Sequence, residues 1–120
     1  MKKETEVHFN FQTGEKEVKT LYTIQVERDS VSLGDDISAP HRNNISLESN
    51  DRLSDFFNKL SKNYLNNLCS DCKWKISSGN LVLGYIIFAT EENPRYELAV
   101  NDDYIIHLNL ELVYCSKEEG

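Results

Sequence analysis

Leu53-Ser-Asp-Phe-Phe-Asn-Lys-Leu-Ser-Lys-Asn-Tyr64 is the stretch that decides the fold class, because it is the one long segment with helical periodicity. Its apolar residues recur at the spacing of a single helical face, which predicts an amphipathic helix over about 50–66. Ser49 or Asn50 can cap the start of this helix, and Asn66-Asn67 can end it. The apolar stripe consists of Leu53, Phe56, Phe57, Leu60 and Tyr64.

The segments on both sides of this helix alternate apolar and polar residues, which is typical of strands. Before it, Val7, Phe9 and Phe11 alternate with polar residues, and a turn at 13–16 leads into a return strand over 22–27. This hairpin places His8 on its polar face. A short strand follows at Asn44–Glu48.

Four more strands are predicted after the helix. They cover 74–77, 81–89, 96–100 and 104–114. The last is the longest, and its alternation directs Ile106, Leu108, Leu110 and Leu112 toward the core. The lone Trp74 is expected in the core as well.

Strands joined by hairpin signals around one helix predict a single α+β domain over residues 1–120. We expect an antiparallel sheet of about six to seven strands, with the helix packed on one face. Residues 81–89 are apolar on both faces, which indicates a central strand whose second face is also covered. A fold-over of the sheet or a second copy of the chain could cover it, so a homodimer is left open.

Composition narrows the function classes. The chain has 120 residues, with 13 Lys and Arg against 20 Asp and Glu, so its formal net charge is −7. Spread negative charge argues against nucleic acid and anionic membrane as partners. It favours a basic protein partner, or serves solubility alone. The longest apolar run is far below the ~20 residues of a membrane span. Without a signal-peptide pattern and with an odd number of cysteines, the chain is expected in the cytoplasm.

One segment, Asp29-Ser-Val-Ser-Leu-Gly-Asp-Asp-Ile-Ser-Ala-Pro-His41, fits no regular secondary structure. Polar loops on rigid scaffolds are where binding and catalysis concentrate. We interpret Asp35, Asp36 and His41 as partner-binding residues. The alternative is a divalent metal site, since carboxylates and imidazole suit such ions. Two observations disfavour this alternative. The neighbouring carboxylates of Asp35 and Asp36 point in different directions in an extended chain, and the segment lacks the ligand spacing of a calcium-binding loop.

The motif Cys69-Ser-Asp-Cys72 is the second candidate site. Its place after a helix C-terminus disfavours a reactive thiolate, and a structural zinc site would need a second closely spaced pair. We interpret both cysteines as structural, with a metal site as the weaker alternative. Nucleophile elbows and glycine-rich phosphate loops are missing from the sequence, so no catalytic residue is assigned and no cofactor is expected.

The pattern Asp29-Ser-Val-x-x-Gly-Asp-Asp-x-x-Ala-Pro-His41, followed by a short strand, a helix and Trp74, resembles a group of small uncharacterised bacterial proteins. That group is similar to the immunity-type accessory proteins of secreted toxin systems. The resemblance covers roughly residues 20–75. It implies a bacterial, cytoplasmic binding protein and assigns no catalytic residue.

Two functional hypotheses follow. The first is a non-enzymatic protein-binding module, immunity-like, that binds a toxin or another protein partner. The second is a small metal-binding protein or metal-dependent enzyme that uses Asp35, Asp36 and His41.

Overall fold

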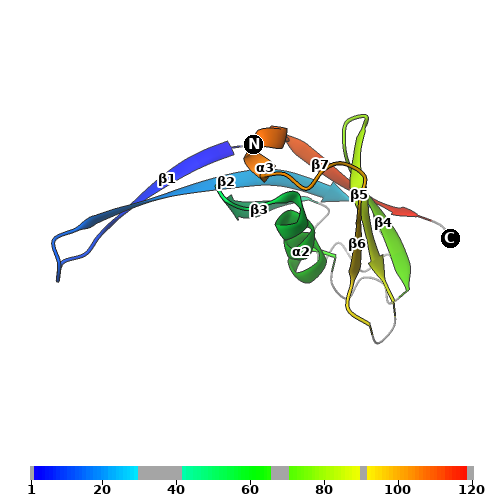
Figure 1. The fold of residues 1–120 in the computed structure, drawn as a ribbon, viewed down its shortest axis with the longest axis horizontal. Helices are drawn as coiled ribbons and strands as arrows, with labels where there is room; N and C mark the ends of the chain where they lie inside the picture. The colour runs from blue at the N-terminus through cyan, green and yellow to red at the C-terminus, as the bar shows by residue number, and fades with distance from the viewer. Residues whose placement is uncertain (1, 30–41, 66–70, 90–91, 119–120) are drawn as a thin grey trace.

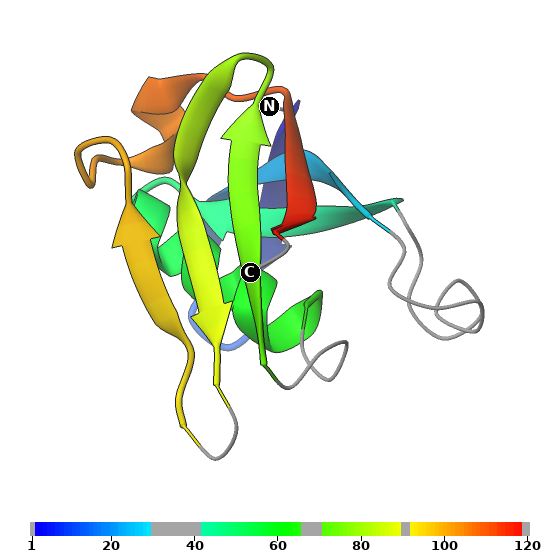
Figure 2. The ribbon, with the colours of Figure 1, turned by 90° about the vertical axis from the view of Figure 1, so that its right-hand side faces the viewer.

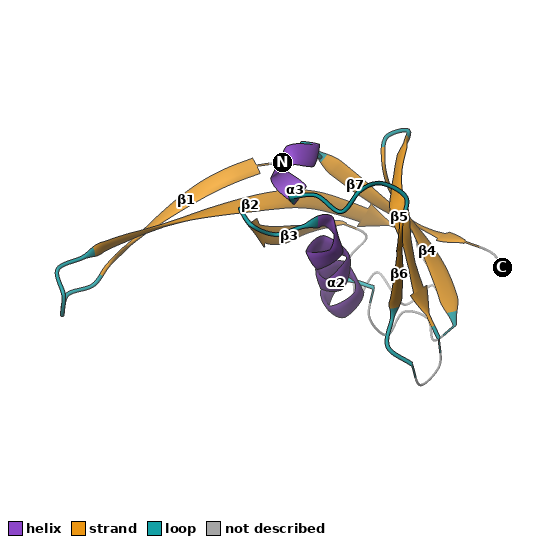
Figure 3. Cartoon of the chain, in the orientation of Figure 1, coloured by secondary structure: helices purple, strands orange, loops and turns teal. Residues whose placement is uncertain are grey.

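The protein is an α+β domain in which strands predominate (Figure 3). The computed structural model describes residues 2–29, 42–65, 71–89 and 92–118. The elements in chain order are β1 (Lys2–Phe9), β2 (Lys16–Arg28), β3 (Arg42–Glu48), α2 (Leu53–Asn63), β4 (Cys72–Ser78), β5 (Leu81–Phe88), β6 (Arg95–Leu98), α3 (Ile105–Leu108) and β7 (Leu112–Glu118).

All seven strands belong to one sheet, with the order β1-β2-β7-β4-β5-β6 and with β3 paired to β2. Strand β2 is long enough to hold three partners. Residues 16–23 pair with β1, residues 21–27 with β3, and residues 25–28 with β7. Residues 21–23 pair with both β1 and β3, so these two strands lie on opposite sides of β2.

The sheet is antiparallel except at one pair. Strands β2 and β7 run parallel, with Gln25 opposite Leu112 and Arg28 opposite Cys115. The expectation of a wholly antiparallel sheet is therefore wrong at this pair, and the sheet is mixed. A parallel pair needs a crossover connection. Here the connection is the whole chain between β2 and β7, which includes α2 and the β4-β5-β6 meander.

The sheet curls from β3 to β6, and α2 lies against its inner side (Figures 1 and 2). At the β3 end, the Lys59 ammonium donates to the backbone oxygen of Ser46 at 2.9 Å. At the β6 end, the Phe57 ring meets the Tyr96 ring edge-on, with centroids 6.2 Å apart. The Ser61 hydroxyl also bonds to the Tyr96 hydroxyl at 2.8 Å. The helix thus bridges both ends of the curl, and its predicted packing on the sheet is confirmed.

The core lies between α2 and the curled sheet. Trp74 on β4 is fully buried there, as predicted. Gly84 on β5 is buried beneath the helix, and a Cβ at this position would lie 2.9 Å from the Phe57 ring and 2.3 Å from the Glu97 carbonyl oxygen. The missing side chain at Gly84 lets the helix and β6 approach β5. The fully buried large side chains include Ile24, Leu47, Phe56, Phe57, Leu60, Trp74, Ile76, Leu83 and Ile86.

Helix α2 begins later than the sequence suggested, and Ser49 and Asn50 do not cap it. The Arg52 N–H donates to the Asp55 carboxylate at 2.8 Å. A residue distant in sequence completes the cap, because the Ser54 N–H and hydroxyl donate to the Asp102 carboxylate at 3.0 and 2.8 Å. Carboxylates at a helix N-terminus satisfy its free N–H groups and complement its dipole.

The predicted strand over 104–114 is confirmed from Leu112 onward and is wrong before it. Residues 105–108 form the short helix α3, which ends at Asn109 in the left-handed conformation with φ 50°. The alternating apolar residues there belong to a helical turn that is hydrogen-bonded to the start of α2. The Leu53 N–H donates to the Asp103 carbonyl oxygen, and the Ile105 N–H donates to the Asp51 carbonyl oxygen. Strand β7 begins only at Leu112 and directs Val113 and Cys115 inward, while Leu112 is 41% exposed.

The N-terminal hairpin extends away from the rest of the molecule (Figure 1). We call residues 2–20 the arm. It accounts for the elongated shape of the molecule, which measures 56 × 32 × 26 Å. The predicted apolar residues of its first strand do not cover the core, because Val7 is 61%, Phe9 48% and Phe11 91% exposed.

Within the described residues, no helix is long and apolar enough to cross a bilayer.

Candidate binding site at the base of the 29–41 segment

The 29–41 segment joins two strands that pair with each other. The last pair in the β2–β3 register is Glu27 with Arg42, whose side chains form an ion pair at 3.0 Å. The predicted partner-binding residues Asp35, Asp36 and His41 lie outside the described residues. The structure therefore describes the base of the segment and not these three side chains.

Asp29 fixes the first end of the segment to β7. Its backbone N–H donates to the Cys115 carbonyl oxygen at 3.0 Å, which extends the parallel ladder by one bond. Its carboxylate accepts a hydrogen bond from the Tyr114 hydroxyl and another from the Lys117 N–H, the latter at 3.1 Å. Three hydrogen bonds to one strand hold Asp29 in a defined position.

Arg28 lies directly beneath this anchor and is 2% exposed. Its Nη1 donates to the Asp29 carbonyl oxygen at 2.9 Å. Its guanidinium carbon lies 5.9 Å from the centroid of the Tyr64 ring, at the C-terminus of α2. A buried arginine so placed joins the end of β2 to the helix and puts a positive charge under the base of the segment.

Three groups near Arg28 and Asp29, Tyr64, Tyr114 and Cys115, have raised pKa values and are held in their neutral forms. The hydrogen bond to Asp29 raises the pKa of Tyr114 to about 12. Burial raises the pKa of the Cys115 thiol to about 12, against a smaller opposing effect of the Arg28 charge. Burial also raises the pKa of Tyr64. A buried thiol with a raised pKa is a poor nucleophile, so Cys115 is not suited to catalysis. This part of the site holds the Asp29 end of the segment in place.

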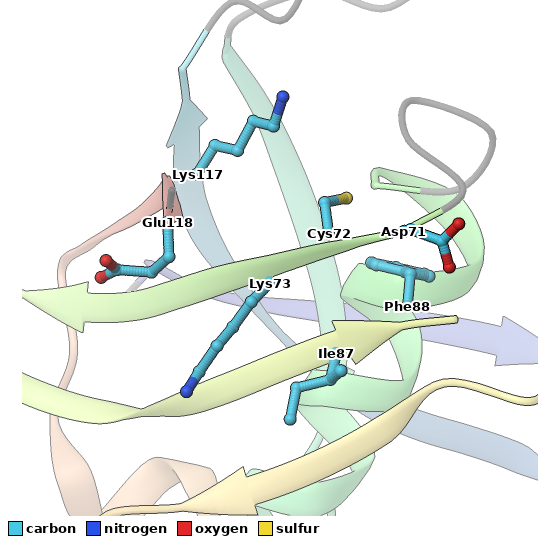
Figure 4. A pocket seen from close by; sticks show the side chains of 7 residues that line it. All are labelled: Asp71, Cys72, Lys73, Ile87, Phe88, Lys117 and Glu118. Carbon is cyan, nitrogen blue, oxygen red and sulfur yellow. The ribbon is translucent and has the colours of Figure 1, made fainter. Parts of the chain in front are cut away.

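Cys72 begins β4 and is partly exposed, while Cys69 lies outside the described residues. Cys72 borders an open hollow of about 500 Å³ near this end of the sheet (Figure 4). Cys72 and Lys117 point to one side of β4, whereas Lys73 and Glu118 point to the other. The charged groups do not converge on one point. The hollow is lined by Asp71, Cys72, Lys73, Ile87, Phe88, Lys117 and Glu118.

In the described ranges, no three His, Cys, Asp or Glu side chains are grouped as metal ligands would be.

A second polar cluster surrounds α3. The His107 Nδ1 lies 3.1 Å from the Asp103 carboxylate, and the His107 ring meets the Tyr104 ring edge-on at 5.4 Å. The Arg52 guanidinium covers the Tyr104 ring at 4.6 Å. The backbone N–H of Tyr104 and the His107 side chain lower the pKa of Asp103. These contacts hold α3 on the start of α2, and we read the cluster as structural.

Sequence reasoning did not identify Asp29 as the residue that anchors the segment to β7. Its signal is the position of an aspartate directly after a long alternating strand. Its partners Tyr114 and Lys117 are more than 80 residues away in the chain. Local patterns carry no information on contacts of this kind.

Comparison of the chain with protein-family models, with curated proteins and with solved structures gave no match.

Proposed function

We propose that this chain is a protein-binding module without catalytic activity, which acts in the cytoplasm. Its contact surface is the 29–41 segment, with Asp35, Asp36 and His41 as the contacting side chains. The observation that supports this most directly is the anchoring of the base of the segment. Asp29 is bonded to β7, and the Glu27–Arg42 ion pair closes the other end.

Anchoring favours binding for a thermodynamic reason. A segment whose ends are already fixed loses less conformational entropy when a partner covers it, so more of the contact energy remains as affinity. Two anchored ends on paired strands are the kind of rigid scaffold on which binding loops are found.

The charge of the chain supports a basic partner. With a net charge of −7, the protein attracts positively charged surfaces at long range and raises their association rate. An immunity-like role, in which the partner is a toxin, agrees with this charge and with the resemblance of residues 20–75.

The test is affinity capture from the native cell with the full chain as bait. The variant is the triple change Asp35→Asn, Asp36→Asn and His41→Ala. The matched control is Glu92→Gln with Glu97→Gln, which removes the same number of carboxylates from exposed positions outside the segment. We expect a protein retained by the wild type and the control to be lost by the triple variant.

Equal retention by the triple variant would overturn the segment as the contact surface. Retention of no protein above background would overturn the binding function itself. Because exposed charges are screened beyond about 10 Å at 0.1 M salt, capture of a basic partner should weaken as salt is raised. Metal found by elemental analysis in the wild type, and absent from the triple variant, would favour a metal-binding protein instead.

A further inference from the structure

The arm is a two-stranded ribbon that stands in solvent. Every side chain described between Lys2 and Lys16 is exposed, and Figure 1 shows the ribbon projecting from the body. An isolated two-stranded hairpin is at best marginally stable in water. The arm also carries an apolar cluster, in which the Phe9 and Phe11 rings meet edge-on at 5.0 Å. Both facts indicate a surface that is completed by another molecule.

The turn determines which backbone groups of β1 are free. Asn10 N–H donates to Glu15 O, and Gly14 N–H donates to Asn10 O, so both backbone groups of Asn10 face β2. Backbone groups alternate in direction along an antiparallel pair. Phe9, Val7, Thr5 and Lys3 therefore present their N–H and C=O groups on the outer edge of β1.

Two copies of this edge can pair around a two-fold axis in several registers. A register centred on Glu4 places the two Glu4 carboxylates opposite each other, which is unfavourable. A register centred on Thr5 sets Val7 opposite Lys3. A register centred on Val7 pairs the two Val7 residues, sets Phe9 opposite Thr5, and extends Phe11 toward Lys3 of the other copy. Only this last one of the three uses the whole apolar cluster.

We propose that the arm is a dimerisation element, in which the outer edge of β1 pairs antiparallel with β1 of a second copy, centred on Val7. The two arms then form a four-stranded sheet. The interface is isologous, so the same residues are buried on both copies. This inference goes beyond the proposed function and does not depend on it.

The distribution of charge favours a second copy at this place. The arm holds four lysines and four glutamates, so it is neutral and the whole net charge of −7 belongs to the rest of the chain. Antiparallel arms carry the two acidic bodies at opposite ends of the shared sheet, which is about 35 Å long at roughly 3.3 Å per residue. That separation exceeds the screening length of about 8–10 Å in physiological salt. The neutral arms therefore meet without strong repulsion between the bodies.

The area predicts a reversible dimer. Edge pairing sets Val7, Phe9 and Phe11 beside residues of the other copy but leaves the face of the sheet in solvent, so only part of the ~150–250 Å² of each aromatic side chain is removed from water. Even with the paired backbone edges, the contact stays below the ~1,200–2,000 Å² of stable specific interfaces, which is the range of weak and reversible contacts. We expect a dimer that dissociates on dilution.

Sedimentation equilibrium over a range of concentrations tests the dimer. The wild-type mass should rise from 13.9 kDa toward twice that value. Val7→Pro removes an N–H that β2 does not use, and Phe11→Ser removes the most exposed ring. Each should raise the dissociation constant at least tenfold, whereas the control Leu81→Ser, at another exposed apolar residue, should leave it unchanged. A wild type that is monomeric up to about 0.5 mM would overturn the proposal, and so would a dimer insensitive to both arm variants.

Cross-linking tests the register. In a background with Cys69→Ser and Cys72→Ser, Val7→Cys should cross-link to itself through a short thiol-reactive linker. Thr13→Cys should not, because antiparallel pairing separates the two copies of residue 13 by about 40 Å at roughly 3.4 Å per residue. Cross-linking of Thr13→Cys without Val7→Cys would show contact between the tips of the arms and would overturn the edge-paired dimer.

Discussion

Asp29 is the residue that anchors the base of the 29–41 segment. The hydrogen bond that its carboxylate accepts from Tyr114 can be removed by deleting the Tyr114 hydroxyl oxygen. Tyr114→Phe keeps the ring and deletes the hydroxyl. A hydrogen bond to a charged group at this partly exposed site contributes about 1 kcal/mol, so the free energy of unfolding should fall by that amount. Urea denaturation measures it. An unchanged midpoint would show that the anchor does not stabilise the fold.

The raised pKa values of Tyr114 and Cys115 predict that the protein becomes less stable at alkaline pH. The pKa of Cys115 is raised from 9.0 to about 12 and that of Tyr114 from 10.0 to about 12. A raised pKa in the folded state means that the folded protein holds protons which the unfolded chain loses. The stabilising effect is complete below pH 9 and is lost as the pH rises toward 12. Unfolding free energies measured from pH 8 to 11 should fall, and the fall should be shallower in Tyr114→Phe.

Gly84 is the residue at which a single methyl group should disturb the core most. Its Cβ would lie 2.3 Å from a backbone oxygen of β6, which cannot move without breaking the sheet. We expect Gly84→Ala to destabilise the protein by about 3 kcal/mol. Gly79→Ala is the matched control, since a Cβ there meets nothing within 4 Å and only its φ of +58° is unfavourable. Control and variant with equal denaturation midpoints would contradict the packing argument.

Among the elements, α2 depends on a cap supplied from the loop before α3. Asp102→Ala should leave the Ser54 N–H without its acceptor and cost about 1 kcal/mol, the usual value of an N-terminal cap. Thermal unfolding followed by circular dichroism measures the loss. Glu97→Ala, an exposed carboxylate on β6, serves as control and should unfold at the wild-type temperature.

The helix was predictable and the last strand was not, for related reasons. Leu53, Phe56 and Phe57 recur at a period that only a helix satisfies. Between 104 and 110 the pattern is too short to separate a helical turn from a strand. The contacts of Asp103 and Ile105 with the start of α2 decide it, and sequence alone does not show them.

Local sequence patterns also failed to predict the contacts between distant segments that shape the sheet and the candidate site. Alternation at Val7 and Phe9 predicted β1, but alternation does not say whether the apolar face meets the core, solvent or another chain. The Asp29–His41 segment was marked by its lack of periodicity. Its anchoring by Tyr114 depends on the parallel β2–β7 pair, whose members are close in space and distant in sequence.

At the scale of the molecule, stability should reside in the curled sheet and α2, and not in the arm. Phe57 is fully buried, so Phe57→Ala should cost about 3–5 kcal/mol. Phe11 is 91% exposed, so Phe11→Ser should change the unfolding free energy of the dilute, monomeric protein by less than about 0.5 kcal/mol. Chemical denaturation at low protein concentration compares them. A large loss in Phe11→Ser would mean that the arm folds as part of the core.

Strand β7 is the seam of the sheet, because it pairs with β2 on one side and with β4 on the other. It follows every other element in the chain. During synthesis, the β1-β2-β3 and β4-β5-β6 parts of the sheet therefore leave the ribosome before any strand pairing joins them. Pairing across so long a separation is slow, and unpaired strand edges favour aggregation. The nascent chain must carry unpaired edges of β2 and β4 until β7 has been made, so its yield in cells should depend on chaperones more than its size suggests.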